Sequence, residues 1–286
     1  MANLANAQNT ISILKKYDFH FQKKFGQNFL IDSHVLNKIV YAAEITKEDF
    51  VLEIGPGIGT LTQYLCERAR QVIAVEIDKN LIPILKETLS PYHNVMILQE
   101  DILKVDIQKI VENYNEGRPI KIVANLPYYI TTRIIMGLLE SHAEVISMTV
   151  MVQKEVASRM QAAPGTKDYG ALSLAVQYYA LPYLAANVPA NCFLPRPKVG
   201  SAVIRLTRYQ QSPVNVKNEA LMFRLIHASF QQRRKTLVNG LFHAEELSFD
   251  KKEIEDALNF CQLPLSIRGE ALTLEQFARL ADAFSK

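Results

Sequence analysis

The sequence predicts an α/β protein with a Rossmann-like, mostly parallel sheet, followed by a small all-helical domain. Between about residues 50 and 153, short apolar runs alternate with amphipathic stretches, which is the pattern of βαβ units. Beyond residue 210 the apolar residues recur only every three to four positions, as in helices. The 286 residues are 49% hydrophobic and 21% charged, enough for one sizeable core and a smaller second one. We therefore expect two domains, 1–209 and 210–286.

Within the first domain the apolar runs predict five strands of a parallel sheet: FVLEI (50–54), QVIAVEI (71–77), NVMILQE (94–100), IKIVAN (120–125) and ISMTVMVQ (146–153). Helices are expected between them, at roughly 59–69, 79–89, 104–114 and 131–140. The segments YLAANV (183–188) and SAVIRLTR (201–208) suit a terminal antiparallel hairpin. The loop between them carries Pro189, Pro195 and Pro197, which could not continue a central strand.

The second domain and the ends of the first are predicted with less detail. KEVASRMQ (154–161) and ALSLAVQYYA (171–180) suit helices. Helical periodicity then covers residues 221–242, 251–260 and 273–284.

Composition also sets limits on location and on metal chemistry. No stretch approaches the roughly 18 apolar residues of a membrane helix, and the N-terminal residues lack an apolar core after a basic start, so we expect a cytoplasmic protein. Cys66, Cys192 and Cys261 are odd in number and far apart, as expected of reduced thiols in a core. The histidines show no metal-ligand spacing, and we expect no metal site.

A glycine loop follows the first predicted strand directly. Gly55, Gly57 and Gly59 let the backbone turn tightly and approach a ligand, and a helix begins at once with Thr60. A dinucleotide fold expects G-x-G-x-x-G, and the missing spacer disfavours a pyrophosphate. Glu53, just before the loop, suits a ligand with an ammonium group. The loop therefore predicts that the cofactor is S-adenosyl-L-methionine (SAM), with its methionine end here.

Polar residues end three further predicted strands. Glu76, Asp101 and Asn125 should meet at one edge, because strand carboxyl ends share an edge in a parallel sheet. Glu76 is expected to accept hydrogen bonds from both ribose hydroxyls of SAM, and Asp101 to receive its adenine amino group. The alternatives are a surface acid at a strand end for Glu76 and a helix N-cap for Asp101.

The motif Asn125-Leu126-Pro127-Tyr128 predicts a reaction at an adenine amino group. An isolated motif of this kind is usually a turn, so its position at the strand end carries the argument. The amino nitrogen is a poor nucleophile until acceptors bind its hydrogens, and the Asn125 oxygen and a backbone carbonyl at Leu126 can serve. Tyr128 offers a surface for stacking. Phe193 could stack on the opposite face of the base, or could be a hydrophobic plug under its loop.

Two basic clusters are candidate RNA-binding sites. Lys23 and Lys24 lie near Lys15 and Lys16, and Arg233, Arg234 and Lys235 are consecutive. Phosphate binding needs several cations on one face, but the formal net charge is only +3 and either cluster could be a solvated surface.

The sequence resembles the ribosomal RNA adenine dimethyltransferases, most closely their bacterial small-subunit members. The resemblance runs from about Lys23 to Ala283 and includes these segments: KKFGQNFLID (23–32), LEIGPGIGTLT (52–62), NLPYYI (125–130), VQKEVASRM (152–160), YGALS (169–173), FLPRPKVGSAV (193–203) and FQQRRKTL (230–237). It implies a SAM-binding catalytic methyltransferase domain and a helical RNA-binding domain. It also implies SAM contacts at Asn28, Leu30, Gly55, Glu76, Asp101 and Asn125, of which the residues alone did not suggest Asn28 or Leu30.

The substrate implied by the resemblance is 16S rRNA within the immature small ribosomal subunit. Two adjacent adenines in a loop near its 3′ end would become N6,N6-dimethyladenine, and we expect the enzyme to act as a monomer. One alternative is a large-subunit rRNA adenine methyltransferase of the antibiotic-resistance type, against which the segments at 233–235 and 268–277 argue. The other is an assembly factor that keeps the fold without catalysis.

Overall fold

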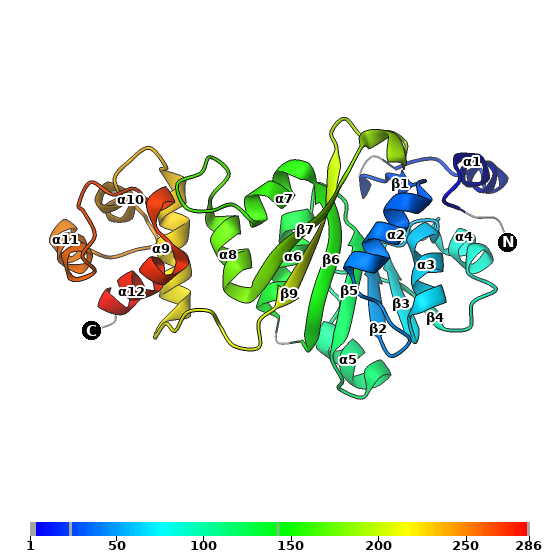
Figure 1. Cartoon of the computed structure of the whole chain (residues 1–286), viewed down its shortest axis with the longest axis horizontal. Helices are drawn as coiled ribbons and strands as arrows, with labels where there is room; N and C mark the ends of the chain where they lie inside the picture. The colour runs from blue at the N-terminus through cyan, green and yellow to red at the C-terminus, as the bar shows by residue number, and fades with distance from the viewer. Residues whose placement is uncertain (1–3, 23–24, 142, 285–286) are drawn as a thin grey trace. The chain divides into compact units, whose positions relative to one another are not determined.

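The computed structural model describes residues 4–22, 25–141 and 143–284. Its centre is a seven-stranded sheet in the order β4-β3-β2-β5-β6-β9-β7 (Figure 1). The strands are β2 (Phe50–Ile54), β3 (Gln71–Glu76), β4 (Val95–Gln99), β5 (Ile120–Asn125), β6 (Val145–Gln153), β7 (Ala180–Val188) and β9 (Ser201–Arg208). β4, β3, β2, β5 and β6 pair in parallel, and β9 runs antiparallel to β6. The predicted sheet, mostly parallel with an antiparallel addition, is confirmed.

The register aligns the carboxyl ends of the central strands. Ile54 of β2 lies opposite Val75 of β3 on one side and Ala124 of β5 on the other. The order of the strands reverses at β2: β3 and β4 lie on one side of it in the sheet, and β5 and β6 lie on the other. In an open parallel sheet this arrangement creates a crevice at the carboxyl ends of the strands, where ligands bind.

Helices cover the sheet because their apolar faces match its buried strands. The predicted helices are present as α3 (Thr60–Arg68), α4 (Ile82–Thr88), α5 (Ile107–Asn115) and α6 (Thr131–Glu140). One further helix, α2 (Ser33–Ala42), begins at Asp32, whose side chain accepts from two backbone amides of the first turn. It lies beside α3 (Figure 1). The two helices share a hydrophobic cluster that includes Leu36, Leu65 and Val72.

The N-terminal segment adds elements that the periodicity did not predict. Helix α1 (Ala7–Lys16) is held to α4 by Lys16, whose ammonium lies 2.6 Å from the Glu87 carboxylate. The short strand β1 (Phe29–Leu30) pairs antiparallel with β8 (Phe193–Leu194). Between β7 and β9 the chain therefore forms a 3-10 turn, η2 (Ala190–Cys192), and β8, rather than a simple hairpin loop.

The chain divides into two compact units, Met1–Ala157 with Pro182–Arg208, and Ser158–Leu181 with Tyr209–Lys286. The second unit resumes at Tyr209, where we expected a boundary, but it also takes in residues 158–181, which the boundary at 209 had placed in the first domain. The reason is packing, because Tyr169, Leu174 and Tyr178 lie in the hydrophobic core of the second unit.

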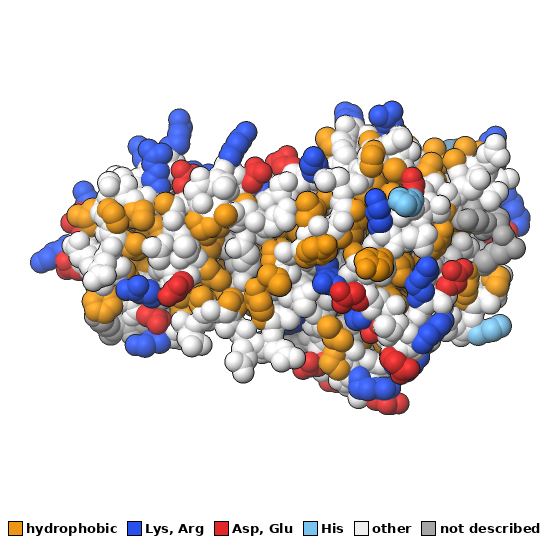
Figure 2. Space-filling model, viewed as in Figure 1, with side chains coloured by type: hydrophobic (Ala, Val, Ile, Leu, Met, Phe, Trp, Pro, Cys, Tyr) orange, Lys and Arg blue, Asp and Glu red, His pale blue; other side chains and the backbone are white. Residues whose placement is uncertain are grey.

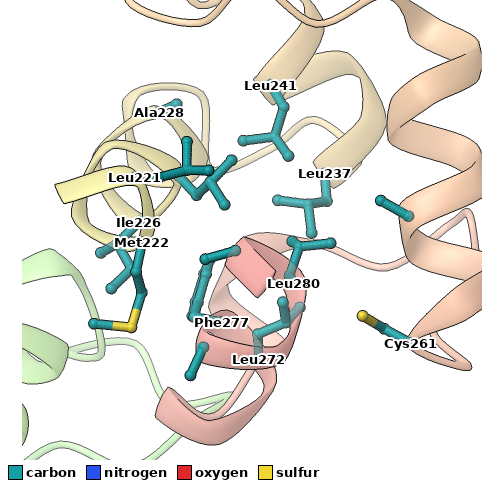
Figure 3. Close-up of a cluster of buried hydrophobic side chains, with 14 of the residues drawn as sticks. Leu221, Met222, Ile226, Ala228, Leu237, Leu241, Cys261, Leu272, Phe277 and Leu280 are labelled. Carbon is teal, nitrogen blue, oxygen red and sulfur yellow. The ribbon is translucent and has the colours of Figure 1, made fainter. Parts of the chain in front are cut away.

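The second unit is helical as predicted. After α7 (Lys154–Met160), its elements are α8 (Ala171–Tyr179), α9 (Glu219–Gln231), α10 (Leu237–Phe242), α11 (Lys251–Phe260), the 3-10 turn η3 (Gly269–Ala271) and α12 (Leu274–Phe284). Met222 of α9, Leu241 of α10 and Phe277 of α12 converge in its core (Figure 3).

Other features concern the membrane, metals and cysteines. Over the ranges that the structure describes, no helix is long and apolar enough to cross a membrane. The same ranges hold no group of three or more His, Cys, Asp or Glu side chains suited to a metal ion. Cys66, Cys192 and Cys261 are buried free thiols, and burial raises the pKa of Cys66 to about 12.

Candidate functional site

A cavity lies at the carboxyl ends of β2, β3 and β5. It contains about 1030 Å³ of empty space, part of it open to solvent, and its walls come from five segments: residues 25–30, 53–61, 75–81, 100–102 and 125–134. Glu53, Gly55, Glu76, Asp101 and Asn125 all line it. The sheet edge predicted from strand ends is therefore a single hollow. Gly57, Asn28, Leu30, Leu126, Pro127 and Tyr128 line the same hollow.

The glycine loop forms the part of the cavity wall that follows β2. Gly55, Gly57 and Gly59 have φ values of 66°, 63° and 90°, in the left-handed region that glycine tolerates best. A side chain at Gly57 would lie 2.9 Å from the Phe29 ring, so the loop packs directly against β1. At Gly55 an added carbon would meet no atom within 4 Å. The backbone is thus exposed to the cavity at Gly55, where a ligand can approach closely.

Glu76 is a buried carboxylate at the end of β3. Its two oxygens accept from the Gly57 amide at 3.1 Å and the Asp78 amide at 2.8 Å, which fixes the side chain toward the glycine loop. Burial raises the pKa of Glu76 to about 7, against the lowering effect of these hydrogen bonds. The alternative of a surface acid is excluded by its exposure of 5%.

Asp101 does not cap a helix, since the N-cap of the following helix, α5, is Asp106. The Asp101 Oδ1 atom accepts from the Leu103 amide at 3.0 Å and so closes a turn, and Asp101 also lines the cavity next to Ile102. A carboxylate has capacity for further donors beyond that bond. The turn therefore leaves Asp101 able to accept from an adenine amino group.

Glu53 provides the strongest electrostatic feature of the cavity. Its side chain is buried, and within the described part of the chain its Oε2 atom has no hydrogen-bond partner. Burial, together with the smaller effect of the nearby Glu76 charge, raises the pKa of Glu53 to about 8. An unpaired buried carboxylate needs a cation or a donor. The ammonium group of SAM meets that need, so the residues present fit this cofactor.

Asn125 lines the cavity at the end of β5. Its amide nitrogen donates to the Asn28 carbonyl at 3.0 Å. A carbonyl can only accept, so this contact fixes which end of the amide is nitrogen and leaves Oδ1 as the available acceptor. The contact also gives Asn28 a role that the sequence pattern did not reveal, because β1 is too short to show periodicity.

The residues after Asn125 form a tight turn. The Pro127 carbonyl accepts from the Thr131 hydroxyl at 2.9 Å. The Leu126 carbonyl belongs to the residue directly after Asn125 and is the candidate backbone acceptor. The Tyr128 hydroxyl lies 2.6 Å from the Ser201 hydroxyl and anchors the half-buried ring at the cavity wall. Tyr129, which the sequence did not single out, also lines the cavity and is 57% exposed.

Phe193 is not among the residues that line the cavity, although its strand partner Leu30 is. It is 3% exposed and packs in the cluster with Leu36 and Val203. The interpretation as a hydrophobic plug under the loop is the one that this position supports. Stacking on a base would require the ring to leave its cluster.

Of the two basic clusters, the structure describes only the one at residues 233–235. Lys23 and Lys24 lie outside the described residues. Arg233, Arg234 and Lys235 occupy the exposed turn between α9 and α10. Arg233 is engaged, with its guanidinium 3.2 Å from both the Glu270 carboxylate and the Lys167 carbonyl. Figure 2 shows Lys and Arg side chains gathered on the side of the second unit that carries α10.

The sheet order, the glycine loop and the acids at the ends of β3 and β4 define a SAM-dependent methyltransferase with a Rossmann-like fold. A model of the family described as "Ribosomal RNA adenine dimethylase" matches residues 18–267. The chain therefore belongs to the ribosomal RNA adenine dimethylase family.

Relatives agree over the full length. The chain is 68% identical to "Ribosomal RNA small subunit methyltransferase A" of Lachnoclostridium phytofermentans, covering 99% of this chain and 98% of the relative. It is 51% identical to the protein of the same name from Lactococcus lactis, covering 98% and 95%.

Two solved structures are similar at lower identity. A dimethyladenosine transferase from Plasmodium falciparum has a TM-score of 0.73 and 28% identity, covering 88% of this chain and 95% of that one. The 23S rRNA methyltransferase ErmE has a TM-score of 0.68 and 27% identity, covering 90% and 100%.

Proposed function

We propose that this protein dimethylates N6 of two adjacent adenines in a loop near the 3′ end of 16S rRNA, within the immature small ribosomal subunit. The observation that carries the proposal is the single cavity, which joins the acids Glu76 and Asp101 to Asn125 and Tyr128. The choice of subunit is supported by relatives named for the small subunit at 68% and 51% identity.

The proposed cofactor contacts follow from the geometry of the cavity. The Glu53 carboxylate and the Gly55 backbone face the methionine end, Glu76 accepts from the ribose hydroxyls, and Asp101 accepts from the adenine amino group. Asn28, just before β1, and Leu30 of β1 close the same space. When bound, SAM supplies an electrophilic methyl group on its sulfonium.

Asn125 and Leu126 prepare the nucleophile. The Asn125 Oδ1 atom and the Leu126 carbonyl each accept one hydrogen of the target amino group, which draws the nitrogen lone pair out of the ring. Tyr128 stacks on the base, worth about 1–3 kcal/mol. After the first transfer the methylated nitrogen loses a proton to water and the spent sulfur leaves as a neutral thioether. One amino hydrogen then remains, so a single acceptor is enough for the second transfer. Alignment of the reacting atoms supplies the rest, up to about 7–11 kcal/mol in favourable cases.

The target base must leave its stack, because N6 in a duplex cannot reach into a cavity. Lys23, Lys24, Arg233, Arg234 and Lys235 are the proposed phosphate contacts that hold the surrounding RNA. The enzyme would act as a monomer in the cytoplasm, where small subunits are assembled.

A methyl-transfer assay tests the proposal directly. Small subunits from a strain that lacks this enzyme are incubated with the protein and SAM, and the nucleosides are identified by mass spectrometry. We expect N6,N6-dimethyladenine at two adjacent adenines. Transfer to another position would overturn the proposal, and binding of immature subunits without any transfer would instead support the assembly-factor alternative.

A second candidate is a large-subunit rRNA adenine methyltransferase, favoured by the similarity to ErmE over 90% of this chain. Primer extension on both rRNAs from a deletion strain separates the two, because only the true target loses its block to the polymerase. We expect the loss in 16S rRNA alone, and a loss confined to 23S rRNA would reverse the assignment.

A further inference from the structure

A third buried carboxylate, after Glu53 and Glu76, is not part of the cavity lining. Asp78 is 2% exposed and follows the ribose acid Glu76 by two residues. Its Oδ2 atom accepts from the Gln27 side-chain amide at 2.7 Å, its shortest hydrogen bond. The Gln22 side chain donates to both oxygens at 3.3 Å, and the Asn80 amide donates to Oδ1 at 3.0 Å. A buried carboxylate of this kind depends on its donors, because burying an unpaired charge is costly.

Gln27 is fixed at both ends of its side-chain amide. Its nitrogen donates to Asp78, and its oxygen accepts from the Gln22 backbone amide at 2.9 Å. The side chain therefore has one orientation, and it holds the backbone on either side of it. On one side is Gly26, which has a φ of 57° and packs so closely that an added Cβ would lie 3.3 Å from the Tyr129 ring.

On the other side of Gln27 lies the residue that orients the reaction site. The Asn28 carbonyl accepts the Asn125 side-chain amide at 3.0 Å, and this contact directs Oδ1 toward the substrate. At the opposite end, the Asp78 backbone amide donates to Glu76 Oε1 at 2.8 Å. A continuous path of short contacts thus runs from the proposed ribose acid through Asp78, Gln27 and Asn28 to Asn125.

We propose that Gln27 and Asp78 are positioning residues for methyl transfer: their hydrogen bond sets the Asn28 carbonyl and thereby the orientation of the Asn125 amide, while it also holds the Glu76 end of the SAM site. Gln27 lines the cavity and Asp78 does not, and the proposal assigns neither side chain a contact with the reacting atoms. The inference deepens the proposed function and relies on it for the transfer substrate only, since SAM binding is measured on the protein alone.

The test uses three variants of the full chain and a matched control. Gln27→Met keeps the length of the side chain but removes the donor, and Asp78→Asn removes the charge. The double variant Gln27→Glu with Asp78→Asn exchanges donor and acceptor and rebuilds the pair in reverse. Gln108→Met is the control, because Gln108 of α5 is also half-buried and donates to a carboxylate, that of Glu112 at 2.8 Å, but does not line the cavity.

Single-turnover transfer to unmodified small subunits at saturating SAM isolates the effect on Asn125, and calorimetry measures SAM affinity. Both single variants should slow transfer about tenfold to a hundredfold, the range for losing a hydrogen bond to a charged group. SAM affinity should fall about threefold to tenfold. The double variant should recover most of both losses, and Gln108→Met should match the wild type.

Two outcomes overturn the inference. One is single variants with wild-type transfer, whether or not they lose thermal stability, and the other is folded single variants whose loss the double variant does not recover. Should Gln27→Met fail to fold, Gln27→Asn keeps the amide but is too short to reach Asp78, and the same results are expected from it. Wild-type protein that binds SAM yet transfers no methyl to small subunits would contradict the proposed substrate, and the calorimetric comparison would still decide the role of Gln27.

Discussion

Asn125 acts in the proposed reaction as a hydrogen-bond acceptor and not as a base. Its amide nitrogen is already committed to the Asn28 carbonyl, so its oxygen is the atom presented to the target amino group. We predict that Asn125→Ala slows methyl transfer about 100-fold or more, the usual loss for one preorganised polar group at a reacting centre. RNA affinity, measured by filter binding, should change less than about threefold, and near-wild-type turnover would contradict the acceptor role.

Glu53 predicts a pH dependence of stability. Its pKa is raised from the usual value of about 4.5 to about 8 in the folded protein, so folding favours the protonated form. The stabilisation is complete below about pH 4.5 and is lost as the pH rises through about 8. The free energy of unfolding without ligand should therefore fall over this window, by up to about 5 kcal/mol for a shift of roughly 3.5 pKa units at about 1.4 kcal/mol each.

Urea denaturation at a series of pH values measures this change, with Glu53→Gln as the comparison. The variant should show a shallower decline, because an amide does not titrate. Saturating SAM should also flatten the curve, since a cation at Glu53 stabilises its charged form. Identical pH profiles for the variant and the wild type would exclude Glu53 as the source.

At the scale of elements, the glycine loop separates packing from ligand binding. Gly55 and Gly57 both have φ values above 60°, but only Gly57 is packed against a side chain, that of Phe29. We predict that Gly57→Ala lowers stability by about 2 kcal/mol or more, because strain and a clash add. Gly55→Ala should lower stability by only about 1 kcal/mol, from strain alone. It should nevertheless weaken SAM binding more than Gly57→Ala does.

Thermal denaturation and calorimetry on the two variants make the comparison. If the two variants lose the same SAM affinity and the same stability as each other, the open space beside Gly55 is not where the cofactor approaches.

The turn between α9 and α10 has two exposed cations that are available to RNA. Arg233 is occupied by Glu270 and Lys167, whereas Arg234 and Lys235 are exposed and form no ion pair within the described residues. Replacing Arg234 and Lys235 with alanine should weaken RNA binding about tenfold and reduce the slope of log affinity against log salt by about two. The control replaces Lys251 and Lys252 of α11, and an equal effect there would point to net charge and not to the turn.

At the scale of the whole molecule, the second unit is assembled from two separate stretches of chain. Tyr169, Leu174 and Tyr178 belong to the same core as the helices after residue 209. We predict that a fragment of residues 210–286 does not unfold cooperatively in urea when followed by circular dichroism, because part of its core is missing. Adding a peptide of residues 158–181 should increase its helicity. A sharp transition of the fragment alone would mean that residues 210–286 form a complete domain.

Much of the fold and part of the site could be predicted because the signals are local. The buried strands β2, β3 and β5 are continuous apolar runs, and parallel pairing then places Glu76 and Asn125 at one edge. The short strands β1 and β8 could not be predicted, since two residues have no periodicity and each depends on the other for its hydrogen bonds. The pair Gln27 and Asp78 could not be predicted for a similar reason, because the two residues are 51 positions apart in the chain.

The sequence by itself determined the class of fold, the cofactor loop, the strand-end acids and the Asn-Leu-Pro-Tyr turn, because each depends on backbone preferences of adjacent residues. Only the tertiary structure decided that Phe193 is packed in a core, that residues 158–181 join the second unit, and that the Asn28 carbonyl orients Asn125. These facts depend on which distant segments share buried surface and hydrogen bonds, and the burial of a side chain is a property of the assembled core and not of its neighbours in the chain.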